Sequence, residues 1–192
     1  MKLTTLLVAA TSFLFAAAAP APYHLGKCAT PDFNHQLFAL SATLGGNGAS
    51  LFPHLLIQLS ATKDGCKAVY PLVTEAKTIL APQDSAMTAD LVAEFTANPS
   101  LLGEYYSTTT ELHRTDFFNQ ANRVIELESA TAIYWVGGMA SLWLEIKGTT
   151  NEAVVLQTDI ATATGTALIL KNAWGQPATL VKRGWPPCST CK

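Results

Sequence analysis

The chain has 192 residues and a formal net charge of −2 at pH 7, with 49% hydrophobic and 14% charged residues. Such a composition can bury a core and is unlike that of disordered proteins, which are poorer in apolar residues. The nearly balanced charge argues against nucleic acid as a partner, because phosphate binding needs clustered Lys and Arg.

Residues 1–18 have the pattern of a secretory signal peptide. Lys2 supplies the basic start, an apolar centre runs from Leu6 to Phe15, and small residues follow at 16–18. The apolar run is shorter than the ~20 residues of a membrane span, and no second long run follows it. We therefore expect cleavage after Ala18 and a secreted, extracellular chain of 174 residues (192 − 18) without a membrane anchor.

Four cysteines follow the signal peptide: Cys28, Cys66, Cys188 and Cys191. An even number in a secreted chain predicts two disulfides, with three possible connectivities. We favour Cys28–Cys66 with Cys188–Cys191; the other two connectivities would tie the C-terminal tail to the N-terminal part of the chain. A thiol-redox role for the Cys188–Cys191 pair is disfavoured, because Pro187 precedes it and no helix start is indicated to lower a thiol pKa.

In chain order, the first predicted element is a β-hairpin over residues 36–61. Its two arms contain alternating apolar residues, with glycines at 45–48 between them: Phe38, Leu40, Ala42 and Leu44, then Leu51, Leu55, Ile57 and Leu59. Pro53 predicts an edge position or a bulge, since it cannot donate a hydrogen bond to a neighbouring strand. Residues 66–73 predict a further short strand.

The next predicted element is a helix over about 85–97. Asp84 can cap it, and Met87, Leu91 and Phe95 share one face at four-residue spacing. Pro99 ends it. Residues 105–122 are ambiguous, because their threonines favour a strand whereas Leu112, Phe117 and Phe118 could line a helix.

The run from Arg123 to Lys171 predicts an antiparallel meander of four strands. A two-residue turn at Gly137–Gly138 would pair Trp135 with Ala140 and Glu128 with Lys147. That register places Leu142 and Leu144 in the core. A loop at 148–152 then pairs Val154, Leu156 and Ile160 with Ile146, Leu144 and Ala140, and a loop at 163–165 returns Leu168 and Leu170 to the same face.

Together these patterns predict a mainly β protein, an antiparallel sandwich or barrel with one packed helix (about 85–97). We expect one secreted domain over residues 19–183 and a separate Pro- and Cys-containing tail over residues 184–192. A barrel with an apolar cavity would suit a small-ligand carrier, and the sequence does not separate it from a sandwich.

Catalytic, metal-binding and phosphate-binding motifs are not found, so we expect no metal and no cofactor. The best catalytic constellation is weak: Glu111, His113 and Asp116 beside Arg114, in which a carboxylate could orient the imidazole. A solvated surface cluster is the favoured interpretation. The sequence leans toward a protein that is not an enzyme.

Tyr134 and Trp143, with Met139 near the turn, are the candidate binding residues. In the predicted register they lie on the outer face of the central hairpin, where exposed aromatic rings can stack on sugars or anchor a protein. The favoured alternative is that the helix around Leu91 covers this face and makes it a second core.

A dibasic pair, Lys182–Arg183, is a site for processing proteases of the secretory pathway. Cleavage would release the peptide 184–192, Gly-Trp-Pro-Pro-Cys-Ser-Thr-Cys-Lys. This peptide resembles the short Trp- and Cys-containing peptide pheromones of filamentous fungi, whose precursors usually carry several copies. The Ala-Pro leader at 19–22 is also common in small fungal secreted proteins.

The sequence thus predicts a small secreted, non-catalytic binding or cell-surface protein of fungal style. Its partner would be an extracellular protein, a glycan or a small apolar ligand, with a wall or host component as one option. The alternatives are a secreted hydrolase with an unrecognised site, and a precursor of the peptide released after Arg183.

Overall fold

The computed structural model describes residues 26–119, 124–127, 131–136, 142–146 and 152–173. Several predicted features lie outside these residues: the signal peptide, the Gly137–Gly138 turn, Met139, the Glu128–Lys147 pair, the dibasic pair Lys182–Arg183, and the tail with Cys188 and Cys191.

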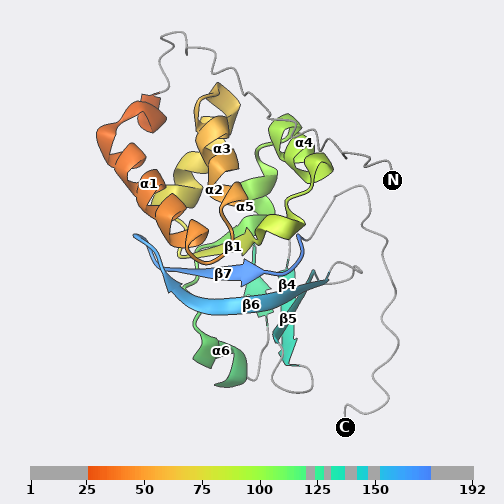
Figure 1. Ribbon diagram of the computed structural model, residues 1–192. Helices are drawn as coiled ribbons and strands as arrows, with labels where there is room; N and C mark the ends of the chain where they lie inside the picture. Colours follow the sequence, from red (N-terminus) through yellow and green to blue (C-terminus); the bar gives the residue numbers. More distant parts are fainter. Residues whose placement is uncertain (1–25, 120–123, 128–130, 137–141, 147–151, 174–192) are drawn as a thin grey trace, which may run out of the picture.

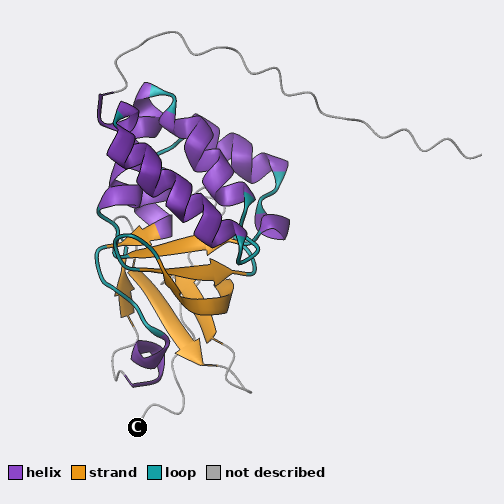
Figure 2. Cartoon of the chain, turned by 60° about the vertical axis from the view of Figure 1, so that its left-hand side comes forward, coloured by secondary structure: helices purple, strands orange, loops and turns teal. Residues whose placement is uncertain are grey.

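Helices and strands form two layers, with α1 to α5 on one side of a curled mixed sheet and α6 beyond its other side (Figures 1 and 2). The helical elements are η1 (Gly26–Ala29), α1 (Pro31–Gly45), α2 (Leu51–Ser60), α3 (Lys63–Thr74), η2 (Asp84–Ala86), α4 (Ala89–Ala97), α5 (Leu101–Tyr106) and α6 (Arg114–Asn119). The strands are β1 (Thr78–Pro82), β2 (Ser107–Thr108), β3 (Val124–Glu126), β4 (Thr131–Val136), β5 (Leu142–Ile146), β6 (Glu152–Ala161) and β7 (Thr166–Leu170). The mainly β class is not confirmed, because helices make up one whole layer.

Helix α1 occupies the place of the first predicted strand. Its buried residues recur at intervals of three and four, which is the helical period: Phe33, Leu37, Leu40 and Leu44. Thr30 caps the helix by accepting a hydrogen bond from the Phe33 amide (3.3 Å), and Pro31 occupies the first position. Phe38, which the predicted hairpin placed in the core, is 66% exposed.

The two strands predicted after α1 are also helices. The buried residues again follow the helical period: Phe52, Leu55, Leu56 and Leu59 in α2, and Cys66, Val69, Leu72 and Val73 in α3. Pro53 is tolerated because it lies in the first turn of α2, where a backbone N–H lacks an intrahelical acceptor anyway. The predicted hairpin over 36–61 and the strand over 66–73 are therefore wrong.

The helix predicted over about 85–97 is confirmed as η2 followed by α4. Met87, Leu91 and Phe95 are buried, as expected. The cap differs, because Thr88 accepts the hydrogen bond from the Leu91 amide (3.2 Å). Asp84 instead caps α2, accepting hydrogen bonds from the Leu51 amide (2.7 Å) and the Ser50 hydroxyl (2.8 Å).

The sheet has the order β2-β1-β7-β6-β5-β4-β3, and β1 and β7 are parallel. Every residue of these two strands is buried, although the sequence indicated no strand at 78–82. Gly165, just before β7, allows the backbone to approach Lys77, just before β1, because a Cβ atom at position 165 would lie 2.1 Å from the Lys77 carbonyl oxygen. The Thr166 amide donates to that same oxygen at 2.8 Å.

The strands of the predicted meander are confirmed in β4 to β7, but their register is not. Tyr134 lies opposite Leu144, and Trp135 lies opposite Trp143. These pairs are shifted by three residues from the predicted ones, and an odd shift exchanges the faces of one strand relative to the other. The burial of Leu142 and Leu144 is nevertheless confirmed, at 5% and 0% exposure.

Strand β6 departs from the predicted alternation. Ala153 and Val155 lie opposite Leu144 and Leu142 and are buried with them, whereas Leu156 is 47% exposed. The pairing of β6 with β7 shifts twice, between Val155 and Gln157 and between Gln157 and Ile160. These bulges insert extra residues, so a period of two cannot hold along the strand.

The core between the layers is rich in aromatic rings. Tyr106 is fully buried, and its ring centroid lies 5.2 Å from that of Phe95 in an edge-to-face contact and 6.2 Å from that of Phe52. Three helices, α2, α4 and α5, are thus joined through one cluster of rings.

Replacing Glu152 with lysine should stabilise the fold at neutral pH. Glu152 lies directly opposite Glu145, and burial, together with the charge of Glu152, raises the pKa of Glu145 above its usual 4.5. A raised carboxyl pKa means that the fold loses stability as the pH rises through that value, so the paired carboxylates are unfavourable at pH 7. We expect a gain of about 0.5 kcal/mol in urea unfolding at pH 7.

Two comparisons test this expectation. Glu152→Gln removes the repulsion without adding an attraction, so its gain should be smaller than that of Glu152→Lys. Both gains should shrink at pH 4, where the carboxyls are increasingly protonated. A loss of stability in Glu152→Lys at pH 7 would contradict the pairing.

Candidate functional site

Two buried threonines on the parallel strands β1 and β7 fix the segment before α6. The Thr78 hydroxyl donates to the Thr110 carbonyl (2.8 Å) and accepts from the Leu112 amide (2.9 Å). The Thr166 hydroxyl donates to the Leu112 carbonyl (3.0 Å). Both polar groups of the Leu112 backbone are therefore satisfied in the interior, which places the residues on either side of Leu112 at the surface.

The surface residues placed in this way include the predicted constellation around His113. Its Nε2 atom lies 3.4 Å from Glu111 Oε1, and its amide donates to Asp116 Oδ2 at 2.7 Å. Its Nδ1 atom lies 3.2 Å from Oδ1 of a third carboxylate, that of Asp159 on β6. The imidazole thus lies between two carboxylates, and its side chain is 48% exposed.

No sequence pattern connects Asp159 with this cluster, since it lies 46 residues from His113. Asp159 sits in the bulged part of β6 with φ = 58°, a conformation that Asp tolerates better than most residues. Its Oδ1 atom accepts from the Arg114 amide (3.0 Å) at the start of α6, and its Oδ2 atom from the Thr158 hydroxyl (2.9 Å). The polar run Gln157-Thr158-Asp159, which follows the apolar residues 153–156 of the strand, is the signal that could have indicated the bulge.

Hydrogen bonds control the protonation of Asp159. Partial burial alone would raise its pKa, but donation from the Arg114 amide, the Thr158 hydroxyl and His113, with the attraction of His113, lowers the pKa below 3.8. A lowered carboxyl pKa contributes stability above the unfolded value and loses it as the pH falls through the folded value. The cluster should therefore weaken below about pH 4.

Replacing Asp159 with asparagine should test this electrostatic contribution. Asparagine tolerates positive φ and can still accept from the Arg114 amide, so the loss at pH 7 should stay below about 1 kcal/mol for this exposed group. The difference from the wild type in urea unfolding should shrink as the pH falls below about 4. Asp159→Ala should cost more, about 2 kcal/mol, because it loses the cap and strains the backbone. A constant difference for Asp159→Asn from pH 7 to pH 3 would contradict this assignment.

The His113 cluster could move protons, but its contacts are those of a surface junction that holds α6 on β6. The three pockets described below are lined by other residues.

Of the candidate binding residues, Trp143 is half-buried. Its position lies on the opposite face of the sheet from that of Tyr134, because Tyr134 pairs with Leu144. The two positions therefore do not share a face of the sheet in the observed register, and a binding role for each residue stays a prediction.

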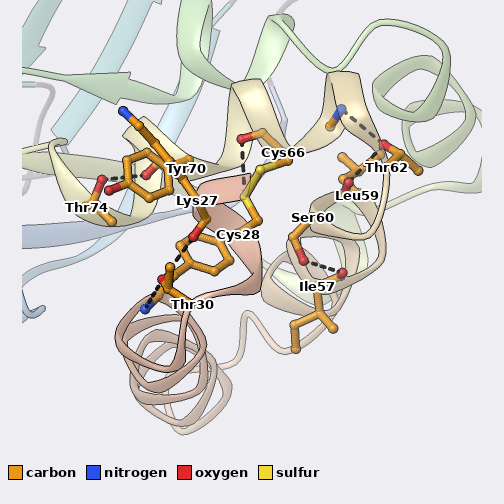
Figure 3. The surroundings of a disulfide bond; sticks show 12 residues. Lys27, Cys28, Thr30, Ile57, Leu59, Ser60, Thr62, Cys66, Tyr70 and Thr74 are labelled. Carbon is orange, nitrogen blue, oxygen red and sulfur yellow. Dashed lines mark hydrogen bonds between the residues drawn. A yellow bond between two sulfur atoms is a disulfide. The ribbon is translucent and has the colours of Figure 1, made fainter. Parts of the chain in front are cut away.

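The disulfide Cys28–Cys66 is present and confirms that part of the predicted connectivity (Figure 3). It ties η1 to α3, and both cysteines are buried. Beside it, the Lys27 ammonium lies 4.9 Å from the centre of the Tyr70 ring, a cation–π contact. The same ring stacks on Phe33 of α1 with a centroid distance of 5.7 Å.

The start of α3 presents two further lysines near this disulfide. Thr62 caps the helix by accepting from the Gly65 amide (3.0 Å), and Gly65 packs so closely that a Cβ atom would lie 2.1 Å from the Leu59 carbonyl oxygen. This close turn sets the direction of α3. Lys63 and Lys67, one helical turn apart, are both exposed.

These side chains line a pocket of about 470 Å³, which we call the disulfide pocket. It is lined by Gly26, Lys27, Lys63, Cys66, Lys67, Tyr70, Pro71 and Glu75. Asp64, outside the lining, pairs with Lys67 at 2.9 Å. The hydrogen bond and charge of Lys67, and more weakly the charge of Lys63, lower the pKa of Asp64 below 3.8. The lining itself carries three lysines against one carboxylate, Glu75.

Two other pockets adjoin the same helix. One, of about 380 Å³, lies between the end of α3 and the residues around β2 and β3, and the other, of about 450 Å³, between α3 and the α4–α5 connection. Pro71 lines all three. Within the described part of the chain, no group of three or more His, Cys, Asp or Glu side chains could hold a metal ion. Likewise, no described helix is long and apolar enough to cross a membrane.

Comparison with known proteins identifies the fold. No family model matches the chain, and no curated protein sequence does. Among solved structures, the chain is similar to a FAS1 domain pair from the insect cell adhesion molecule fasciclin I, with a TM-score of 0.51 and 18% sequence identity. The match covers 66% of this chain and 45% of that one, so the chain spans less than half of the solved protein. At this identity the likeness shows a FAS1-type fold and nothing further.

Proposed function

We propose that this protein is an extracellular, non-catalytic binding protein of the cell-surface or adhesion type. Two observations together carry the proposal: a FAS1-type fold, similar to that of a solved domain pair from a cell adhesion molecule, and a buried disulfide. Structural disulfides persist in oxidising compartments and are rare where glutathione keeps thiols reduced. The pattern of a signal peptide at residues 1–18 supports the same placement.

The described surface also favours binding over catalysis. The His113 cluster is half exposed and uses its carboxylates to cap α6, whereas the three pockets around α3 combine apolar and charged linings. A binding protein needs only such a complementary surface.

Secretion is tested by expressing the full chain in a eukaryotic host. The protein in the medium should begin after Ala18 and should contain no free thiol at Cys28 or Cys66, as mass spectrometry with and without reduction would show. Retention inside the cell with both thiols reduced would overturn the extracellular placement.

Adhesion is tested by coating beads with the secreted protein and measuring their attachment to cells and to isolated wall material. Beads coated with the reduced and alkylated protein provide the matched control. Attachment above this control, without release of soluble wall fragments, is the expected result. Release of fragments without attachment would favour a hydrolase instead.

A further inference from the structure

We propose that the disulfide pocket binds a small saccharide that carries sulfate or carboxylate groups. Nothing in the sequence indicated this site, because its lysines come from two separate segments. The saccharide class rests on the extracellular placement proposed above, whereas the preference for anions rests on the charges of the pocket alone.

Among the described residues, basic side chains gather at this pocket, whereas acidic side chains predominate elsewhere. The described residues contain 13 acidic side chains (the 14 of the chain less Glu128) but only six basic ones: Lys27, Lys63, Lys67, Lys77, Arg114 and Lys171. Three of these six line the disulfide pocket, against one acidic lining residue, Glu75. A concave positive site on a negative protein concentrates anions locally.

Most of this charge is available to a ligand. Among the described residues, neither Lys27 nor Lys63 has a carboxylate within ion-pair distance. The Lys67–Asp64 pair is exposed at both ends, with side chains 68% and 78% accessible, so an incoming anion can compete with Asp64 for Lys67. Ammonium groups on flexible stems bind anions as point charges and suit scattered sulfate or carboxylate groups.

The size and lining of the pocket define the body of the ligand. A volume of about 470 Å³ lies within the range of small-molecule sites and can hold one or two sugar rings. Tyr70 and Pro71 supply apolar surface against which the C–H groups of a ring can pack. Tyr70 itself is held by Phe33 and Lys27, so this wall is formed before a ligand arrives.

The disulfide is part of the site, because it joins the two segments that supply the lysines. Lys27 belongs to η1, whereas Lys63 and Lys67 belong to α3, and the Cys28–Cys66 bond connects these elements directly (Figure 3).

The first test is to titrate the full chain with a fully sulfated disaccharide and to measure the binding by isothermal calorimetry. Its unsulfated counterpart and inorganic sulfate serve as comparison probes. The sulfated disaccharide should bind at least about tenfold more tightly than either, since only it engages both the lysines and the apolar wall. Equal affinity for the unsulfated sugar would overturn the proposed preference for anionic groups. Equal affinity for inorganic sulfate would overturn the proposal that the ligand is a saccharide.

The second test uses charge-matched variants. Lys63→Gln with Lys67→Gln should weaken disaccharide binding about tenfold, which corresponds to two lost charged contacts. Lys77→Gln with Lys171→Gln removes the same charge elsewhere and should change the affinity less than about twofold. Equal losses of affinity in the two double variants would show diffuse attraction to the whole surface and would overturn the assignment of binding to the disulfide pocket.

The third test is a gain of binding, which misfolding cannot produce. Glu75→Gln removes the one acidic lining residue and should tighten binding about threefold, and Asp64→Asn should do so by freeing Lys67. Absence of a gain in both variants would overturn the proposed position of the ligand. Failure of these titrations leaves secretion and bead attachment unaffected, so this inference and the proposed function can fail separately.

Discussion

Replacing Cys28 and Cys66 together with alanine should lower the free energy of unfolding by about 4 kcal/mol. The bond joins residues 38 positions apart, and cross-linking them removes that loop's closure entropy from the unfolded chain. Alanine is preferred to serine because both sulfur atoms are buried, at 5% and 9% residue exposure, and a hydroxyl there would add a desolvation cost. The loss would be measured by urea denaturation of the oxidised wild type and of the variant.

Reduction of the wild-type protein provides the control for this experiment. If the bond itself stabilises the fold, the reduced wild type and the double variant should unfold at nearly the same urea concentration. A loss below about 1 kcal/mol in both would contradict the loop-entropy argument and would mean that η1 is held by its other contacts. Those contacts are the Lys27–Tyr70 pair and the hydrogen bond from the Thr30 hydroxyl to the Lys27 carbonyl (2.9 Å).

Leu144→Ala should cost about 2–5 kcal/mol, as expected for truncation of a buried leucine. Leu144 is fully buried in β5, and the residue directly opposite it on β6 is the small residue Ala153. Because alanine at 153 cannot fill the space, much of the cavity should persist, which favours the upper part of this range. Thermal and urea unfolding of the purified variant would measure the loss.

Leu156→Ala is the matched control, since it removes the same atoms from the same sheet. Leu156 is 47% exposed, so its truncation should cost about 0.5 kcal/mol or less. The predicted meander placed Leu156 opposite Leu144 and therefore in the core. Equal losses for the two variants would support that register against the observed one.

The sequence predicted the strands of the meander well and their register poorly. Alternation from Leu142 to Ile146 identifies a strand and its buried face, because side chains on a strand alternate sides. Register depends instead on the length of the connections, and the predicted two-residue turn at 137–138 gave a pairing three residues away from the observed one. In β6 the bulges break the period itself, so no uninterrupted alternation could have located Val155 in the core.

The helical layer was missed because short apolar runs satisfy two periods at once. Leu40 and Leu44 lie on one face of a strand and also on one face of a helix. Phe33 and the cap at Thr30 would have favoured the helix, but both precede the predicted hairpin at 36–61, and Leu37 within it does not fit the alternation of Phe38, Leu40, Ala42 and Leu44. A window that began at Thr30 could have indicated α1.

The candidate sites show the same limit at longer range. Glu111, His113 and Asp116 were found because they are neighbours in the sequence, whereas Asp159 joins them only through the pairing of distant strands. The disulfide pocket depends on the Cys28–Cys66 bond, which was predicted. Its lysines, however, can be recognised as lining one pocket only when η1 and α3 are seen side by side. Local patterns identify candidate groups, and topology decides which of them meet.

The position of β7 also has a consequence for synthesis. The parallel partner of β1 comes 88 residues after it, and β7 is the strand that joins the β1–β2 pair to the rest of the sheet. While the ribosome is still adding residues before Thr166, the helices can form, but the edge of β1 that pairs with β7 stays without its partner strand. A chain that stops short of β7 would leave two incomplete sheets with open edges, and such fragments should aggregate rather than accumulate as a smaller soluble protein.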